Sequence, residues 1–408
     1  MTIPASPAAL ALLAPVAFAA APLAASPTHD PPPAVRPVWS DPDFAGAASV
    51  DAADFDGDGL LDLAGSSYYD DEFVWWRQTP DQQFERHSVF PINTAFDFEA
   101  ADLDGDGDPD LYGSSLSSSP FGEDTVWWFE NRLSETGDYD AAFVPHLLFV
   151  FPNQDPRSMD AADFDGDGHL DLAVAFVYDE DIHLFLNPTG QGPQGPPLLV
   201  EVPQVNGVAV VQGVDFDADG DVDLVAGTAW NSTYGVNVYW YENYGNAVFG
   251  PRIPIAGGSD FAALFTVRPA DVDGDGLIDV VTAHDGTFGS PFVRWIPRRD
   301  PAGTEWGDPI VVDPAFYGST GDQGLAVSDL DGDGDLDLLG GSFLVDRKVR
   351  AWLNNGVGEF TSFDLDTDAG AHGVLAADLD GDGLPEVAAA QWGECCYSGG
   401  MQLWKLRF

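Results

Sequence analysis

Short runs of alternating hydrophobic and polar residues recur along this chain, and turn residues separate them. Because 45% of the residues are hydrophobic and 45 are glycine, the pattern predicts many short strands around a large core rather than long helices. The fourth of the repeating units described below shows the pattern well. Its expected strands are Val208–Phe216, Val222–Thr228, Val236–Glu242 and Phe249–Ile255.

A ten-residue acidic segment repeats seven times, and it follows the first expected strand of each unit. The first copy begins at Asp54 and reads DFDGDGLLDL, and the intervals between copies are 48, 61, 52, 56, 58 and 49 residues. A repeat of this length is typical of propellers and solenoids. The other copies begin at Asp102, Asp163, Asp215, Asp271, Asp329 and Asp378.

The seven copies agree at the positions that a cation would need. Positions 1, 3 and 5 are always Asp, position 9 is Asp or Glu386, and position 6 is always Gly. Position 7 varies freely, as expected if it contributes only its backbone carbonyl. Oxygen ligands in this order suit Ca²⁺, which takes six to eight of them. The expected ligands are Asp54, Asp56, Asp58, Leu60 and Asp62; Asp102, Asp104, Asp106, Asp108 and Asp110; Asp163, Asp165, Asp167, His169 and Asp171; Asp215, Asp217, Asp219, Asp221 and Asp223; Asp271, Asp273, Asp275, Leu277 and Asp279; Asp329, Asp331, Asp333, Asp335 and Asp337; and Asp378, Asp380, Asp382, Leu384 and Glu386.

The segments are not EF-hands, although both share the start D-x-D-x-D-G. An EF-hand needs flanking helices and a Glu at position 12. Here position 12 is never acidic, and the flanks alternate as strands do, for example around Leu61 and Leu63. The acidic segments therefore join strands.

Seven units of four strands predict an all-β fold, a seven-bladed β-propeller of antiparallel blades over residues 34–408. The seventh unit has three expected strands, Gly373–Asp378, Glu386–Gln391 and Met401–Phe408. We expect Ala34–Ser40 to supply its fourth strand and so to close the ring.

The loop D-x-D-G-D-G-x-x-D with strand flanks resembles the FG-GAP or VCBS repeats, including those of integrin α-subunit propellers. The resemblance covers nearly the whole chain after residue 34. It implies up to seven structural Ca²⁺ ions, held by the loop Asp side chains in the turn between the first two strands of each blade. Ala218, Glu386, Pro109 and Pro385 depart from the commonest pattern.

The charge balance excludes several partners. The chain has 68 Asp and Glu against 15 Lys and Arg, which gives a formal net charge of −53. Nucleic acids and anionic membranes would be repelled, so we expect neither nucleic-acid binding nor membrane insertion. Seven Ca²⁺ ions would add 14 positive charges and bring −53 to −39.

The N-terminal residues predict export. Residues 1–26 are uncharged and rich in Ala and Leu, which is typical of a secretory signal peptide, although the usual basic start is missing. Residues 27–33 read as a Pro-rich linker. We expect an extracellular or periplasmic protein. The two cysteines, Cys395 and Cys396, are adjacent, which leaves a strained vicinal disulfide, free thiols or an intermolecular bridge open.

The rim opposite the acidic loops is the expected ligand site. Its loops place aromatic rings among Ser, Asp and Gly, which suits a glycan or a protein, although single rings could instead cap blade cores. We expect a binding or adhesion module rather than an enzyme, because no catalytic motif occurs; a lectin-like or lyase-like protein acting on polysaccharide is the alternative. The expected rim residues are Tyr68, Tyr69, Phe121, Tyr178, Trp230, Tyr234, Phe288, Phe343, Trp392 and Tyr397.

Overall fold

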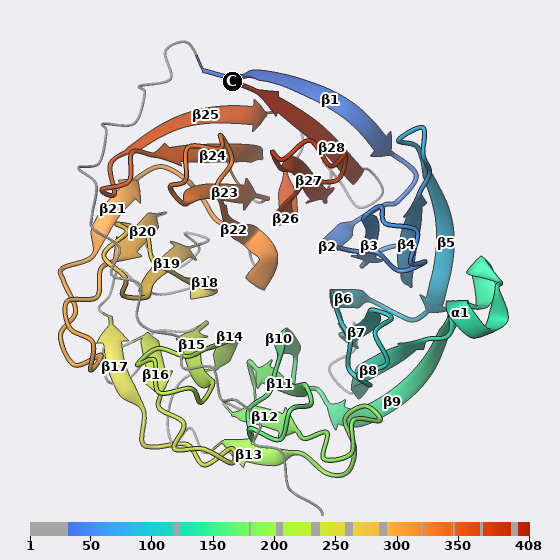
Figure 1. Ribbon diagram of the computed structural model, residues 1–408, viewed down its shortest axis with the longest axis horizontal. Coiled ribbons are helices and arrows are strands. Elements are labelled where there is room, and N and C mark those ends of the chain that lie inside the picture. The colour runs from blue at the N-terminus through green and yellow to red at the C-terminus, as the bar shows by residue number, and fades with distance from the viewer. Residues whose placement is uncertain are drawn as a thin grey trace, which may run out of the picture.

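The computed structural model describes residues 32–117, 123–178, 181–200, 207–229, 237–257, 264–284, 292–319, 321–343, 345, 347–367, 370–392 and 399–408. Within these residues, 28 strands form seven four-stranded antiparallel sheets, arranged as blades around a central axis (Figure 1). The predicted seven-bladed propeller is therefore confirmed. No helix among these residues is long and apolar enough to cross a membrane.

Each blade runs from an inner strand at the axis to an outer strand at the wall. Blades 1 to 3 contain β2 (Ala47–Ala53), β3 (Asp62–Ser67), β4 (Glu72–Gln78) and β5 (Phe84–Pro91); β6 (Ala95–Ala101), β7 (Asp110–Ser115), β8 (Glu123–Asn131) and β9 (Phe143–Pro152); and β10 (Pro156–Ala162), β11 (Asp171–Phe176), β12 (Ile182–Phe185) and β13 (Leu198–Val200). Blades 4 to 6 contain β14 (Val208–Val214), β15 (Asp223–Thr228), β16 (Val238–Tyr241) and β17 (Ile253–Ala256); β18 (Leu264–Ala270), β19 (Asp279–His284), β20 (Val293–Ile296) and β21 (Ile310–Asp313); and β22 (Leu325–Ser328), β23 (Asp337–Ser342), β24 (Lys348–Asn354) and β25 (Phe360–Asp366). Short helical turns, α1 (Leu133–Thr136), η1 (Tyr139–Ala141) and η3 (Asp322–Gly324), lie in connections between strands.

The seventh blade closes the ring with strands from both ends of the propeller. It contains β26 (Ala371–Ala377), β27 (Glu386–Gln391), β28 (Gly400–Arg407) and, outermost, β1 (Ala34–Asp41). β1 pairs antiparallel with β28, with Val35 opposite Leu406. This is the closure that the sequence predicts.

The hydrophobic core lies between neighbouring blades. Seven buried clusters each combine residues of two adjacent blades. At the closing seam, for example, Trp76 of blade 1 packs in one cluster with Leu403 of blade 7. The third strands of five blades contribute a tryptophan to this core, and all five are buried: Trp76, Trp128, Trp240, Trp295 and Trp352.

Several strands are shorter than their hydrophobic patterns predict. In blade 4 the inner strand ends at Val214 rather than Phe216, and the outer strand begins at Ile253 rather than Phe249. The inner strand ends early because Asp223 takes the backbone amide of Phe216 out of the ladder. The outer strand starts late because a turn, in which Tyr244 N donates to Val248 O, uses the residues before it. The predicted signal peptide, most of the predicted linker, and Cys395 and Cys396 lie outside the described residues.

Candidate metal loops and ligand rim

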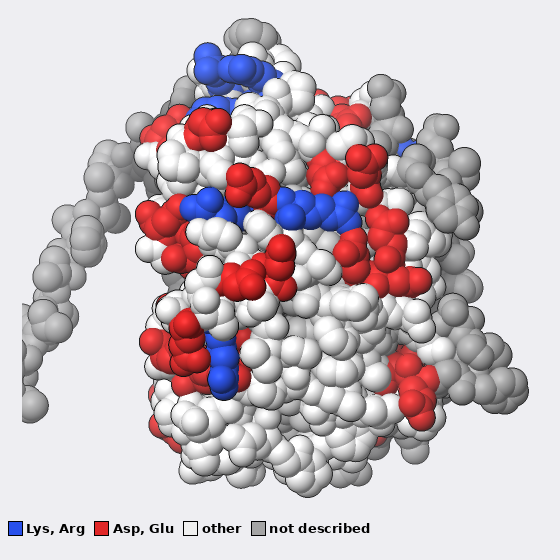
Figure 2. Space-filling view, turned by 90° about the vertical axis from the view of Figure 1, so that its right-hand side faces the viewer, with Lys and Arg blue, Asp and Glu red and all other residues white. Residues whose placement is uncertain are grey.

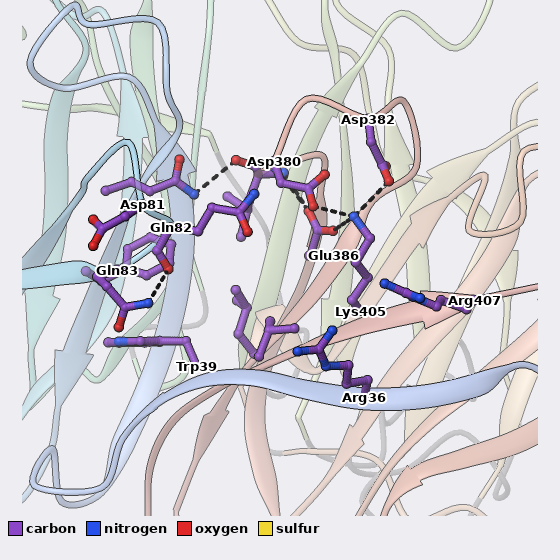
Figure 3. Close-up of a pocket in the computed structure, with 15 residues that line it drawn as sticks. Arg36, Trp39, Asp81, Gln82, Gln83, Asp380, Asp382, Glu386, Lys405 and Arg407 are labelled. Atoms are coloured by element: carbon purple, nitrogen blue, oxygen red, sulfur yellow. Dashed lines mark hydrogen bonds and ion pairs between the residues drawn. The ribbon is translucent and has the colours of Figure 1, made fainter.

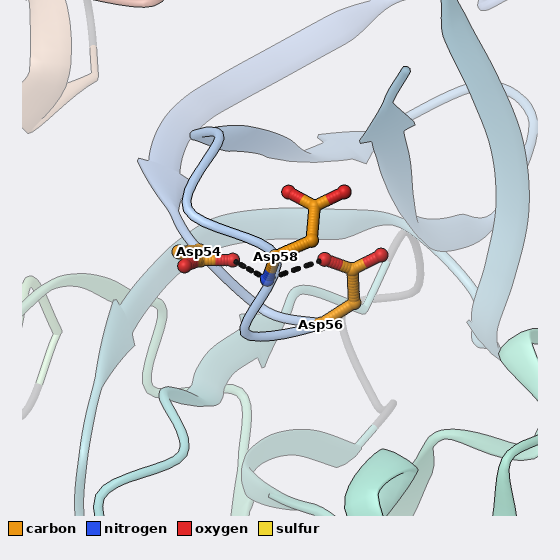
Figure 4. Close-up of side chains that lie close together, drawn as sticks. All are labelled: Asp54, Asp56 and Asp58. Carbon is orange, nitrogen blue, oxygen red and sulfur yellow. Dashed lines mark hydrogen bonds between the residues drawn. The ribbon is translucent and has the colours of Figure 1, made fainter. Parts of the chain in front are cut away.

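The seven acidic segments are the turns between the first and second strands of each blade, all on one rim of the propeller. In the first loop, Asp54, Asp56 and Asp58 each place a carboxylate oxygen within 4.8 Å of the others (Figure 4). The amide of Asp58 donates to Asp54 Oδ1 at 3.0 Å and to Asp56 Oδ1 at 3.1 Å. Groups of the same kind occur in the next three loops, formed by Asp102, Asp104 and Asp110; Asp163, Asp165 and Asp167; and Asp215, Asp217 and Asp223.

Backbone amides hold the carboxylates of every loop in place. In all seven loops the amide of position 6 donates to Oδ2 of position 1 at 2.9–3.1 Å. The amide of position 7 donates to Oδ1 of position 5 at 2.9–3.2 Å. The turn requires positive φ at positions 4 and 6, as at Gly57 (70°) and Gly59 (91°). Ala218 adopts a φ of 60° at position 4, so the fourth loop forms despite its departure from Gly.

The position 9 carboxylate has a structural role that the sequence pattern did not reveal. Asp62 is fully buried, and it accepts from Phe55 N at 3.0 Å and from Gln78 N at 2.7 Å. The first contact recurs in all seven loops at 2.9–3.2 Å. The second recurs at 2.7 Å in blades 1 to 6. Position 9 thus fastens the acidic loop to the end of the third strand.

The side chain at that strand end also clamps the loop of the preceding blade. Asn131 Nδ2 donates to Phe55 O at 2.9 Å, and Asn243 Nδ2 donates to Phe164 O at 2.8 Å. Equivalent contacts come from Asn187, Asn354, Gln78 and Arg298. The repeated Asn at this point was a sequence signal that could have revealed the clamp.

Burial makes the loops electrostatically unfavourable on their own. Desolvation raises the pKa of Asp62 to about 7 and that of Asp337 to about 8, and nearby carboxylates add to the rise. The hydrogen bonds from backbone amides lower both pKa values but do not cancel this effect. Asp102 Oδ1 and Asp273 Oδ1 are buried and accept no hydrogen bond from the residues that the structure describes. Unpaired buried carboxylate oxygens of this kind fit a hard cation.

Among the described residues, two loops hold a protein cation in close contact with their carboxylates, and in the fifth loop Arg299 Nη1 lies 3.8 Å from Asp273 Oδ2. The two close cations occupy equivalent positions on the third strand of their blades. Each comes directly after the third-strand residue that pairs with loop position 10. In blades 1 to 7 this position holds Arg77, Glu130, Leu186, Glu242, Pro297, Leu353 and Lys405. In the first loop, Arg77 Nε lies 2.5 Å from Asp56 Oδ2. In the seventh, Lys405 Nζ contacts Asp380, lies 2.8 Å from Asp382 Oδ2 and lies 2.9 Å from Glu386 Oε1 (Figure 3). The seventh loop therefore does not fit a divalent ion as it stands.

Four of the predicted rim aromatics converge on one another at the opposite rim. The Trp392 ring lies 5.2 Å from each of the Tyr68, Tyr69 and Phe343 rings, measured between centroids. Tyr178 stands apart and is 56% exposed. The other five predicted rim residues, Phe121, Trp230, Tyr234, Phe288 and Tyr397, lie outside the described residues.

The rim cluster continues inward toward the axis. His372 lies 5.2 Å from Trp392 and 5.2 Å from Phe96, and its Nδ1 is 3.0 Å from Ala48 O. Burial lowers the pKa of His372 to about 4, so the ring is neutral at ordinary pH. Tyr68 and Trp392 also pack against the buried residues Phe96 and Leu116. These rings therefore have one face on the protein and are only partly buried.

Comparison with known families agrees with the loop geometry. The family model described as an FG-GAP-like repeat matches residues 54–113, 163–226, 215–282, 271–340 and 329–389, more than half of the chain. The chain belongs to the FG-GAP-like repeat family. No curated protein matches the sequence.

Solved structures share the fold of this FG-GAP-like propeller. One is a lectin from Agrocybe aegerita, described as specifically recognising non-reducing terminal N-acetylglucosamine. It is 19% identical, with 79% of this chain and 81% of the lectin aligned at a TM-score of 0.50. The Dos1 propeller is 11% identical, with 91% and 95% of the two chains aligned at a TM-score of 0.53. At these identities the likeness shows the fold alone.

A cavity of about 470 Å³ lies at the seam between blades 7 and 1 (Figure 3). Arg36 and Arg407 line it beside Trp39, Asp81 and the Lys405 cluster. Sequence reasoning missed this cavity because its walls come from the closing strand and from blades at opposite ends of the chain. The cavity thus gathers the cations Arg36, Arg407 and Lys405. On the face of the molecule shown in Figure 2, several Lys and Arg side chains lie beside Asp and Glu.

Proposed function

We propose that this FG-GAP-like propeller is a secreted binding module, in which Ca²⁺ stabilises the acidic loops and the opposite rim holds an extracellular glycan or protein. The observation that carries the proposal is the aromatic cluster around Trp392. Its rings come from three loops of blades 1, 6 and 7. A ring that only caps the core of its own blade does not need rings from other blades beside it.

A glycan is the favoured ligand class. Partly buried Tyr and Trp rings beside polar loop residues offer an apolar face and hydrogen-bonding groups together, as sugar recognition requires. The solved lectin of the same fold recognises a terminal N-acetylglucosamine, which supports this choice. A protein ligand would use the same rim through a larger contact.

A glycan array with the full-length protein tests the proposal. We expect Trp392→Ala to lower affinity for the ligand at least about tenfold, or about 1.4 kcal/mol, because the central ring is lost. Tyr178→Ala is the matched control, since this ring is exposed but outside the cluster. Full binding by Trp392→Ala would place the ligand elsewhere and contradict the proposal.

Calcium belongs to the proposal as a structural ion of the second to sixth loops. In these loops no protein cation lies at the position held by Arg77 and Lys405, although Arg299 lies 3.8 Å from Asp273 Oδ2 in the fifth. Asp102 Oδ1 and Asp273 Oδ1 are buried and accept no hydrogen bond from the described residues. When bound, the ion would neutralise carboxylates that otherwise repel one another. Ions that bind only the folded state stabilise it by about 2.7 kcal/mol per site at one hundred times the Kd. We therefore expect excess EDTA to lower the melting temperature by many degrees; an unchanged melting curve would refute structural Ca²⁺.

A lyase-like action on acidic polysaccharide is the second candidate, and the seam cavity favours it. Arg36, Arg407 and Trp39 could hold a uronate. Lys405 is an unsuitable base: partial desolvation lowers its pKa, but three carboxylate contacts outweigh this and raise the pKa well above its usual value. Release of unsaturated uronic products, seen as ultraviolet absorbance, would support the lyase. Binding without product supports the lectin-like module.

Secretion completes the proposal. Residues 1–26 would be removed during export, and the Ca²⁺ concentration outside the cell would keep weak loop sites filled. N-terminal sequencing of protein recovered from the culture medium or periplasm tests this. Full-length protein retained in the cytoplasm would contradict it.

A further inference from the structure

The repeat places one residue per blade at the same height in the central channel. This residue lies three positions before each acidic loop, on the inner strand that faces the axis (Figure 1). The seven residues line a common cavity of about 340 Å³, and they are Asp51, Glu99, Asp160, Gln212, Arg268, Ala326 and Leu375. The channel therefore contains a polar ring with three carboxylates and one guanidinium.

The turn η3 reaches into this channel and adds a further carboxylate. Gln323 Oε1 accepts from Val50 N at 2.8 Å, and Gln323 Nε2 donates to Glu99 Oε1 at 3.2 Å. These contacts fix η3 against blades 1 and 2. As a result Asp322, Asp97 and Glu99 each place an oxygen within 4.8 Å of the others.

Asp97 and Asp322 are buried, Glu99 is half-buried, and the group is incompletely paired. Asp97 Oδ2 accepts from Met159 N at 2.9 Å, and Glu99 Oε2 accepts from Tyr112 Oη at 2.6 Å. Asp322 is only 3% exposed, and its Oδ2 accepts no hydrogen bond from the described part of the chain. A buried carboxylate oxygen without a donor is costly unless a cation faces it.

Arg268 is the cation among the residues that line this cavity, and its charge lowers the pKa of Asp97, Glu99 and Asp322, but one cation does not balance the carboxylates around it. Five carboxylates, including those of Asp51 and Asp160, share the channel with Arg268. The guanidinium of Arg268 donates to Val267 O at 3.0 Å and forms no ion pair within the residues described. Burial first, and then the neighbouring carboxylates, raise the pKa of Asp322 to about 7 and that of Asp97 well above its usual value. The channel is therefore short of positive charge.

We propose that Asp97, Glu99 and Asp322 bind a divalent metal ion in the central channel, separate from the acidic loops. Ca²⁺–oxygen distances of about 2.3–2.6 Å place two ligands on opposite sides of an ion about 4.6–5.2 Å apart, so oxygens within 4.8 Å of one another can surround one ion. The ion would tie the inner strand of blade 2 to the turn that enters blade 6. It would thus brace the ring across its centre, independently of any rim ligand.

Counting bound ions tests the proposal directly. The full chain is equilibrated with CaCl₂ or MgCl₂ alone, dialysed and measured by native mass spectrometry. We expect Asp322→Asn to hold one ion fewer than the wild type in at least one metal. Asp160→Asn is the matched control, because it removes a half-buried channel carboxylate outside the cluster and should keep the full number. Equal ion numbers in all three proteins would overturn the proposal.

Melting temperatures give a second readout. Since the wild type and the variant have the same loop sites, the contribution of those sites cancels when the two proteins are compared in the same buffer. If the ion binds, Asp322→Asn should melt below the wild type in the presence of the metal, because the variant lacks a ligand. In EDTA it should melt above the wild type, because the substitution removes a charge that repels Asp97 and Glu99. If the variant melts above the wild type equally in both conditions, the carboxylates share protons and the proposal fails. Asp97→Asn repeats both measurements if Asp322→Asn does not fold.

Discussion

Replacing Lys405 with methionine separates the seventh loop from the others. The Lys405 side chain is 15% exposed, and its ammonium lies among Asp380, Asp382 and the nearly buried Glu386. Methionine keeps much of the volume but removes the charge. Losing one partner of a fully buried ion pair costs about 3–5 kcal/mol. Because water still reaches this cluster, and exposed pairs contribute far less, we expect a loss of about 2 kcal/mol in the absence of metal.

For the 333 residues that the structure describes, an unfolding entropy of about 2.1 cal/mol/K per residue converts this loss to a melting temperature lower by about 3 °C in EDTA. Calorimetry in EDTA measures it. Added Ca²⁺ should then recover the stability of Lys405→Met, since the freed carboxylates form a loop like those for which we propose Ca²⁺, the second to sixth. Native mass spectrometry should show one more bound ion than in the wild type.

Arg407→Met is the matched control, because Arg407 lines the same cavity and its charge acts on Asp382, but it forms no ion pair within the described residues. It should change neither the melting temperature in EDTA nor the ion number. If Lys405→Met behaves like Arg407→Met, the ammonium does not stabilise the loop and the reasoning is refuted.

Three further predictions follow from the loops, the closure and the charge. In EDTA, the free energy of unfolding should fall as the pH rises from about 4 to 8. Asp62 and Asp337 have folded-state pKa values of about 7 and 8, above the value in the unfolded chain. The folded state therefore binds more protons than the unfolded state in this window, and it loses this advantage as the pH rises. Saturating Ca²⁺ should weaken or reverse this slope in thermal melts, whereas an identical slope in both conditions would argue against metal at these loops. Deleting residues 34–40 should sharply lower the melting temperature, because β28 loses its partner, while deleting residues 27–31 should not; equal melting of both deletions would contradict the closure. Calorimetry in 1 M NaCl should show little change in the Ca²⁺-loaded protein, since buried sites are screened weakly; a large loss would mean that exposed charges dominate.

The fold could be predicted from the sequence because one physical pattern repeats seven times. Each copy fixes the place of a turn, and the alternation beside it fixes two strands. Even the closure by residues 34–41 follows from counting strands in the last unit. Strand ends were predicted less well, since hydrophobicity does not show where a side chain such as Asp223 captures a backbone amide.

The candidate sites were less predictable, because they depend on contacts between blades. The motif predicts seven equivalent loops. In the structure the loops differ, because a third-strand residue outside the motif is a cation in some blades and not in others. Lys405 and Arg77 have no local signature: only the strand pairing aligns them with the acidic loops. The convergence of Tyr68 and Trp392 likewise joins loops more than 300 residues apart.

The positions of the protein cations suggest that the loops at the closing seam and the loops of the other blades are stabilised in different ways. The two loops with a protein cation in close contact belong to blades 1 and 7, which meet at the closing seam, whereas Arg299 of blade 5 lies farther from its loop, 3.8 Å from Asp273. A seam formed by the two ends of the propeller opens first when the protein frays. Fixed ammonium and guanidinium groups would hold these two loops without any ion, whereas the inner blades can depend on Ca²⁺ because their neighbours on both sides keep them folded. The closure would then survive a fall in Ca²⁺ that weakens the rest of the ring.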